Sequence, residues 1–175
     1  GAAGFMGAIT AAEEGLSSVV ILESTTKTLE KVRISGGGRC NVTNACWNLS
    51  DLVTNYPRGM PALLGSLGSF LPSDAVAWFA DRGVRLVEEL DGRIFPEANS
   101  SIAILNCFRK AAKNSGVKVI TQSTVIGLEL LQENFFSVTC RGGKNLFGKF
   151  VLLATGGHPS GKRLAKNMGH KLIDS

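Results

Sequence analysis

Residues 32–44 read VRISGGGRCNVTN, and this stretch carries the strongest indication of the fold. It is expected to begin extended and to break at three consecutive glycines, 36–38, which are poor in either a helix or a strand. We therefore expect a loop whose backbone amides closely approach a ligand. Arg39 follows with a planar set of donors that suits phosphate oxygens, and Asn41 offers its amide to a polar ring edge. A flexible surface turn with a solvated arginine is the alternative.

A second glycine cluster lies at the start of the chain. Residues 1–4, GAAG, have the form of the last four residues of a GxGxxG fingerprint, with Gly1 and Gly4 as its second and third glycines. Gly1 would let the backbone approach a pyrophosphate, and Gly4 would let the following helix pack closely on a strand. The first glycine and the first strand are expected before residue 1. A helix packed tightly by small residues is the alternative.

The residues after GAAG supply the context that such a fingerprint needs. Helix formers and small residues occupy positions 1–14, and the apolar run from Val19 to Glu23 is typical of a buried parallel strand. Glu23 lies 19 residues after Gly4, where a carboxylate accepts hydrogen bonds from ribose hydroxyls and repels a 2′-phosphate. An NADP-type ligand is therefore disfavoured at this position. If the fingerprint is wrong, Glu23 is a solvated strand end.

The rest of the chain predicts an α/β domain with a small antiparallel β-meander. Helices are expected from Ser73 to about Arg82, and from Ser100 or Ser101 to about Asn114. Strand-like runs occupy 92–96, 117–120, 124–131, 135–140 and 146–157, the last containing a buried strand from Phe150 to Ala154. We predict that 48–91 form a mostly helical insertion within a domain made of 1–47 and 92–175.

The composition limits the class of protein. With 175 residues, 44% of them hydrophobic, the chain is too apolar to be disordered, and its apolar runs fall short of the roughly 20 residues of a membrane span. Surface scaling for its mass predicts an accessible area of about 8,000 Å² for one compact domain. The formal charge is +5 without a block of five or six basic residues, which disfavours a nucleic-acid arm. Because no secretory signal begins the chain, we expect a cytoplasmic protein, or one of an organellar matrix or stroma.

The cysteines and histidines form no recognisable metal or redox motif. The four cysteines contain no CxxC pair and the two histidines lie far from them, so no metal site is expected. Cys40 adjoins the glycine loop, but Cys46 is six positions away, so we expect a packed structural thiol and not half of a redox pair. His158 and His170 are expected at a turn, a helix end or the surface.

Five segments, in this order along the chain, together resemble a known family. They are GAAGFMGAITAAE (1–13), ILE (21–23), KVRISGGGRCNVTN (31–44), GRIFPEANSS (92–101) and LLATGG (152–157). They look like the N-terminal half of the BaiN-like flavoproteins, also described as YhiN-like or aminoacetone-oxidase-like FAD-dependent oxidoreductases. The resemblance implies a Rossmann-like FAD/NAD(P)-binding domain, present here as a fragment without its first strand and its C-terminal half.

The resemblance also implies which residues hold FAD. Gly1, Ala3 and Gly4 are expected at the pyrophosphate, Glu23 at the adenosine ribose, Ser35, Gly37, Gly38, Arg39, Cys40 and Asn41 along the pyrophosphate toward the flavin, Val125 at adenine through its backbone, and Ala154, Thr155, Gly156 and Gly157 in a turn over the dinucleotide. The stretch after that turn, HPSGKRLAKNMGHKL, is shorter than in many relatives, so no contact is carried over onto it.

The function expected from these residues is that of an FAD-dependent oxidoreductase, in which bound FAD transfers a hydride to or from a small molecule. NADH or NADPH is the candidate electron donor. No side chain stands out as an acid, base or nucleophile, so no catalytic residue is assigned. Two alternatives stay open: a non-catalytic or RNA-associated dinucleotide-binding module, and an NAD-dependent dehydrogenase. Neither a membrane nor nucleic acid is expected as a partner, and the oligomeric state is not predicted.

Overall fold

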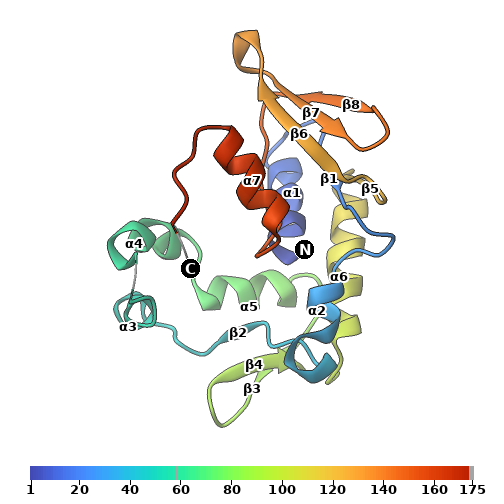
Figure 1. Cartoon of the computed structure of the whole chain (residues 1–175). Coiled ribbons are helices and arrows are strands. Elements are labelled where there is room, and N and C mark those ends of the chain that lie inside the picture. The colour runs from blue at the N-terminus through green and yellow to red at the C-terminus, as the bar shows by residue number, and fades with distance from the viewer. Residues whose placement is uncertain (58, 174–175) are drawn as a thin grey trace. The chain divides into compact units, whose positions relative to one another are not determined.

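The computed structural model describes residues 1–57 and 59–173, and the chain divides into two compact units (Figure 1). Unit 1 comprises Gly1–Glu30 and Lys110–Ser175, and unit 2 comprises Lys31–Arg109. Unit 2 is wider than the insertion of 48–91 expected from the sequence. The compact units do not test where an insertion begins. The predicted boundaries of 48–91 therefore stay a prediction.

Unit 1 begins with the helix and strand that the sequence predicts. Helix α1, Ala2–Glu13, is followed by β1, Val20–Leu22, which pairs in parallel with β5, Lys118–Ile120. Phe5 and Ile9 are buried on one side of α1, and Gly15 adopts a φ of 99° just after the helix ends. A helix that leads into a strand with a parallel neighbour is the Rossmann-like α/β arrangement, which confirms the predicted fold class.

The predicted β-meander follows in the same unit. Strands β6, Val125–Leu130, β7, Phe136–Cys140, and β8, Asn145–Gly148, form an antiparallel sheet in that order, with the short 3₁₀ turn η2, Gln132–Asn134, between the first two. Helix α7, Pro159–Asn167, packs against this sheet, where Leu164 meets the paired residues Leu128 and Val138. One face of the meander is therefore covered by a helix.

The prediction of a buried strand from Phe150 to Ala154 is wrong for this chain. No strand within the described residues pairs with this segment, and its side chains are largely exposed, Phe150 by 70% and Leu152 by 67%. The segment instead passes beside α1, where Ala154 lies against Gly4 and Leu152 against Gly7. An apolar run becomes a buried strand only where a neighbouring strand supplies hydrogen bonds, and none is present here.

Unit 2 surrounds a small antiparallel sheet. Its elements are α2 (Glu30–Ile34), the 3₁₀ turn η1 (Ser35–Gly38), β2 (Thr43–Asn44), α3 (Leu49–Thr54), α4 (Met60–Ser69), α5 (Pro72–Ala80), β3 (Leu86–Glu88) and β4 (Arg93–Pro96). The strand order is β2-β4-β3. Helix α6, Ser101–Asn114, begins in unit 2, where the rings of Phe79 and Phe108 pack edge to face, 5.5 Å between their centroids.

Helix α6 has the predicted bounds and buries the four residues expected on its inner face, namely Ile104, Leu105, Phe108 and Ala112. Other local expectations for unit 2 are wrong. Residues 32–34 are helical and not extended, and the Ser101 hydroxyl donates to the Arg33 carbonyl at 2.7 Å. Strand β3 was not expected at all. Helix α5 begins one residue before the expected cap, because Leu71 N–H donates to the Asp74 carboxylate at 2.7 Å.

Candidate functional site

The N-terminus of α1 leaves its backbone open. A Cβ placed on Gly1 would meet nothing within 4 Å, whereas one on Gly4 would touch the Ala154 Cβ at 3.4 Å. Gly4 therefore lies against the segment that contains Ala154, and Gly1 leaves access to the first N–H groups of the helix. Ala3 lies exposed in the same turn, which contains no acidic residue. Free amides and the helix dipole together favour an anion at this end.

Glu23 follows β1 on a fixed backbone. Its N–H donates to the Ile120 carbonyl at 2.9 Å, and its own carbonyl accepts from the Ser123 N–H at 2.8 Å. One carboxylate oxygen, Oε1, accepts hydrogen bonds from the backbone N–H and the hydroxyl of Thr25 at 2.9 and 3.0 Å. The second oxygen, Oε2, accepts none from the described part of the chain. It is available to a ribose hydroxyl.

The three glycines of η1 have different structural roles. All adopt positive φ, 55° at Gly36, 67° at Gly37 and 88° at Gly38. A Cβ on Gly36 would approach the Asn41 nitrogen at 2.8 Å and the Phe95 ring at 2.9 Å, so this position needs glycine for packing as well as for its backbone angle. Gly37 and Gly38 meet nothing within 4 Å. Their backbone is therefore open, and the close approach of a ligand to it stays a prediction.

Arg39 is held by partners that the sequence did not reveal. Its guanidinium lies 4.0 Å from the centre of the Phe95 ring and forms an ion pair with Glu89 at 2.5 Å. Arg93 lies over the same ring at 5.4 Å and reaches Glu89 at 3.6 Å. Glu89 is 50 positions from Arg39, so no local pattern pointed to it. To bind a phosphate, Arg39 must share its donors with Glu89 or release that carboxylate.

Cys40 and Asn41 complete the loop after η1. Cys40 is buried with a φ of 65°, and its N–H donates to the Ser35 carbonyl at 2.9 Å, which ties the loop closed. Burial raises the pKa of the Cys40 thiol, and a hydrogen bond with the Ser35 side chain opposes this in part. A buried, protonated thiol is a poor nucleophile, in agreement with a packing role. Asn41 is exposed.

Residues 154–157, which were predicted to form a turn, contact both α1 and α7 within unit 1. Gly156 has a φ of 59°, and a Cβ on Gly157 would meet nothing within 4 Å. Thr155 packs against Gly161 of α7, where an added Cβ would lie 2.9 Å from the Thr155 Cβ. Val125 begins β6, where it pairs with Cys140, and its side chain packs on the Leu164 cluster, so the predicted adenine contact would have to come from its backbone.

The histidines and cysteines offer no metal site within the described residues, where no group of three or more His, Cys, Asp or Glu side chains converges. His158 is the N-cap of α7, and its Nδ1 accepts from the Ser160 N–H at 3.2 Å. In the part of the chain that the structure describes, no helix is long and apolar enough to cross a membrane.

The predicted site residues therefore form two sets, each within its own unit. Unit 1 holds the α1 terminus, Glu23, Val125 and the 154–157 turn, and unit 2 holds the loop from Ser35 to Asn41. Open glycine backbone and a carboxylate with a free oxygen fit the phosphates and ribose of a dinucleotide such as FAD. Their contacts with a cofactor remain predictions.

A Rossmann-like unit with these features defines a nucleotide-binding domain as the class of protein. Residues 1–175 match the family described as the HI0933-like protein Rossmann domain, and the chain belongs to this family. This confirms the resemblance drawn from the five sequence segments, and at the level of the family it supports an FAD-dependent oxidoreductase.

Two curated relatives match almost the whole chain. The 3-dehydro-bile acid delta(4,6)-reductase of Clostridium scindens is 29% identical over 98% of this chain and 43% of its own length. The ribosomal RNA dihydrouridine synthase of Haemophilus influenzae is 24% identical over 99% of this chain and 44% of its own length. The chain thus spans less than half the length of these relatives. Among solved structures, the Diels-Alderase PyrE3 matches with a TM-score of 0.44 and 16% identity, over 83% of this chain and 28% of that one.

Proposed function

We propose that this chain is the FAD-binding part of a flavin-dependent oxidoreductase, which passes a hydride through bound FAD to or from a small molecule. The observation that carries the proposal is the bare, positive-φ backbone at Gly37 and Gly38, inside the segment that most resembles the family. Backbone of this kind costs conformational entropy and leaves surface uncovered, and close approach of a ligand to the main chain is one of its uses.

Each predicted contact has a physical role in this proposal. The open N-terminus of α1 would hold the pyrophosphate, since its N–H groups and dipole favour negative charge. Oε2 of Glu23 would accept a ribose hydroxyl, and the η1 loop would extend along the dinucleotide toward the flavin. Bound FAD supplies the hydride chemistry, with NADH or NADPH as the candidate donor, and the protein supplies orientation and electrostatics.

The names of the two relatives suggest a substrate class. A 3-dehydro bile acid with a Δ(4,6) system and the uracil base both contain a carbon–carbon double bond conjugated with a carbonyl group. Saturating such a bond adds a hydride to the carbon distant from the carbonyl and a proton to the adjacent carbon. We propose that the complete protein reduces a double bond of this type, because the same addition of a hydride and a proton would saturate the bond in either compound.

The cofactor is tested by purification without added flavin. The protein is expected to be yellow and to release FAD on denaturation, identified by its mobility and fluorescence. A colourless protein that binds NAD and not FAD would instead favour the dehydrogenase alternative.

Glu23→Ala tests the ribose contact. Loss of hydrogen bonds to a charged partner is expected to weaken FAD binding by about 1.5–3 kcal/mol, measured by calorimetry or by quenching of flavin fluorescence. Glu14→Ala, an exposed carboxylate after the last turn of α1, is the matched control and is expected to leave FAD affinity unchanged. Equal affinities for the two variants would make Glu23 a solvated strand end.

A further inference from the structure

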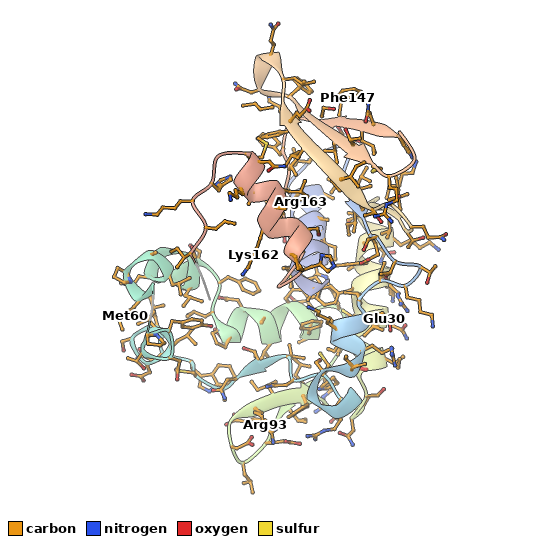
Figure 2. The ribbon with its side chains drawn as sticks, viewed as in Figure 1. Glu30, Met60, Arg93, Phe147, Lys162 and Arg163 are labelled. Carbon is orange, nitrogen blue, oxygen red and sulfur yellow. The ribbon has the colours of Figure 1, made fainter. Side chains whose placement is uncertain are left out.

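A carboxylate to which the proposed function assigns no role lies between two arginines of unit 2. Oε1 of Glu89 pairs with Nη1 of Arg39 at 2.5 Å, and Oε2 lies 3.6 Å from Nη2 of Arg93. Both guanidinium groups lie over the ring of Phe95, at 4.0 and 5.4 Å from its centre. Figure 2 labels Arg93 on the hairpin of β3 and β4. Two cations on one aromatic ring thus share one carboxylate.

The β3–β4 hairpin fixes both groups that hold Arg39. The N–H of Glu89 donates to the Arg93 carbonyl at 2.8 Å, and the Glu89 carbonyl accepts from the Gly92 N–H at 2.8 Å. Phe95 is 1% exposed, and its backbone pairs with Val87. The guanidinium of Arg39 therefore has one face and one nitrogen in fixed contacts before any ligand binds.

The two arginines depend on Glu89 to different degrees. Arg93 has a second carboxylate, because its Nε donates to Oδ2 of Asp91 at 2.7 Å. Arg39 pairs with Glu89 alone among the described residues, and its Nε and Nη2 have no hydrogen-bond partner there. The side chain of Arg39 is 32% exposed, so these donors are open to a ligand.

An oxyanion that binds Arg39 encounters Glu89 as a competitor. A phosphate prefers two parallel donors from one edge of a guanidinium. At the edge formed by Nε and Nη2, the phosphate and Glu89 would lie on neighbouring sides of one cation and repel each other. At the edge that includes Nη1, the carboxylate would have to leave. In both cases Glu89 lowers the affinity of Arg39 for an anion.

The same contact stabilises Arg39 when no ligand is bound. A partly buried cation loses hydration, which costs free energy unless a counter-charge lies beside it. Glu89 supplies that charge directly after the three glycines of η1, whose positive φ angles already make the loop costly to order. The ion pair therefore favours the folded loop and disfavours its anionic ligand.

We propose that Glu89 is the built-in counter-ion of Arg39, and that it yields this arginine to the pyrophosphate of a bound dinucleotide while Arg93 keeps the carboxylate paired. The statement rests on the proposed function, which predicts the phosphate contact of Arg39. Glu89 and Arg93 are then positioning residues, because they act on the ligand through Arg39. Loss of Glu89 has opposite effects on the stability of the FAD-free protein and on its affinity for the dinucleotide.

Glu89→Gln tests the counter-ion in the complete protein, with Glu97→Gln as the matched control. The control loses the same charge from an ion pair of the same unit, to Arg85 at 3.4 Å. Glu89→Gln retains an oxygen that can accept from Arg39. It is expected to lower the thermal midpoint of the FAD-free protein by about 2–4 °C and to raise FAD affinity by about 3- to 5-fold at low salt. The control is expected to change neither, and quenching of flavin fluorescence measures the affinity.

A double-mutant cycle tests whether Arg93 acts through Glu89. Arg93→Gln leaves the carboxylate with Arg39 alone, so it is expected to weaken FAD binding by about 3-fold, whereas Arg85→Gln, its matched control, has no effect. In the Glu89→Gln background, Arg93→Gln is expected to lose most of its effect. A full effect in that background would make Arg93 a direct contact of the ligand and overturn its positioning role.

The signs of the two changes distinguish a counter-ion from an ion pair with a structural role alone. A structural pair predicts that Glu89→Gln lowers both the thermal midpoint and FAD affinity, and that result would overturn the proposal. Glu89→Asp, which keeps the charge on a shorter side chain, replaces Glu89→Gln if the latter does not fold. It is expected to show both changes at a smaller size.

FAD and the nicotinamide dinucleotides both contain a pyrophosphate, so the KM values for NADH and NADPH are measured in the FAD-loaded variants. A lower KM with unchanged FAD affinity supports the counter-ion and assigns the pyrophosphate to the electron donor. Unchanged KM and unchanged FAD affinity in Glu89→Gln overturn the counter-ion alone. A wild-type protein that neither contains nor binds FAD overturns the proposed function instead.

Discussion

At the residue scale, alanine substitutions at Gly36 and Gly37 distinguish a glycine needed for packing from a glycine that leaves room for a ligand. Gly37→Ala adds a Cβ in a left-handed backbone with open space around it, so it is expected to cost about 1–2 kcal/mol of unfolding free energy. Gly36→Ala adds contacts with Asn41 and Phe95 as well, and overpacking of this kind costs about 1–3 kcal/mol more. Urea unfolding measures both.

The two substitutions differ again in their effect on FAD. Because only Gly37 leaves its backbone open, Gly37→Ala is expected to weaken FAD binding by more than its stability change explains, measured by flavin fluorescence at a temperature where the variant is folded. A Gly37 variant with unchanged FAD affinity would assign this loop to packing alone.

Cys40 yields a prediction about pH. Its pKa is raised by burial, so the thiol stays protonated at neutral pH and its thiolate forms only above the ordinary range for cysteine. Cys46 is half-buried, and the other two cysteines are buried. Native protein at pH 7.5 is therefore expected to show one thiol reactive toward Ellman's reagent, which Cys46→Ser removes, while Cys40 reacts only at alkaline pH or after unfolding. Rapid reaction of the Cys46→Ser variant at pH 7.5 would contradict the packed thiol.

At this scale, the sequence predicted those features that depend only on residues adjacent in the chain. Consecutive glycines at 36–38 are poor in helix and strand, and the structure has all three at positive φ, with open space beside Gly37 and Gly38. The same reasoning could not show that Gly36 is packed while the glycines beside it are open, because its neighbour Phe95 lies far away in the sequence. Glu89 was missed for the same reason: the contacts of Arg39 depend on how β3 and β4 pair, not on the residues beside it.

At the scale of elements, the close approach between α7 and the turn before it depends on Gly161. An alanine there would drive a Cβ into the side chain of Thr155. Gly161→Ala is expected to destabilise the protein by about 1–3 kcal/mol despite the better helix propensity of alanine, because the added Cβ would overpack α7 against Thr155 while Leu164 anchors the helix on the meander. Thermal unfolding measures the change, and Gly161→Ala/Thr155→Ala, which removes the hydroxyl that the added Cβ would meet first, is expected to restore part of it. A stabilised Gly161→Ala variant would show that α7 is free to shift.

The sequence predicted well those elements whose pattern depends only on their own residues. The predicted helix 101–114 has four inward residues at helical spacing, and it appears with the predicted bounds. The predictions for 32–34 and 150–154 failed because short apolar runs suit helix and strand alike, and neighbours decide between them. Residues 32–34 are helical, and the Ser101 hydroxyl caps a carbonyl there. Residues 150–154 have no partner strand within the described residues.

At the scale of the whole molecule, each of the two units exposes large apolar side chains, including Phe150 and Leu152 in unit 1 and Trp47 and Phe70 in unit 2. Exposed apolar side chains that lie together mark surfaces that bind a ligand or another part of a protein. The chain spans less than half the length of the curated relatives it matches.

The place of the strand expected before Gly1 can be tested by experiment. Helix α1 contacts β1 and also packs on Ala154 and Leu152, so a strand that leads directly into α1 would lie between β1 and residues 150–154. A version extended at its N-terminus by a short Val- and Ile-rich segment ending in Gly-Ala is therefore expected to protect the amides of 151–154 and of Val20–Leu22 from hydrogen exchange. The matched control has prolines within the extension, which cannot donate to a ladder. The first extension should also raise the thermal midpoint and lower binding of the dye ANS, and equal exchange in the two versions would exclude a first strand at this position.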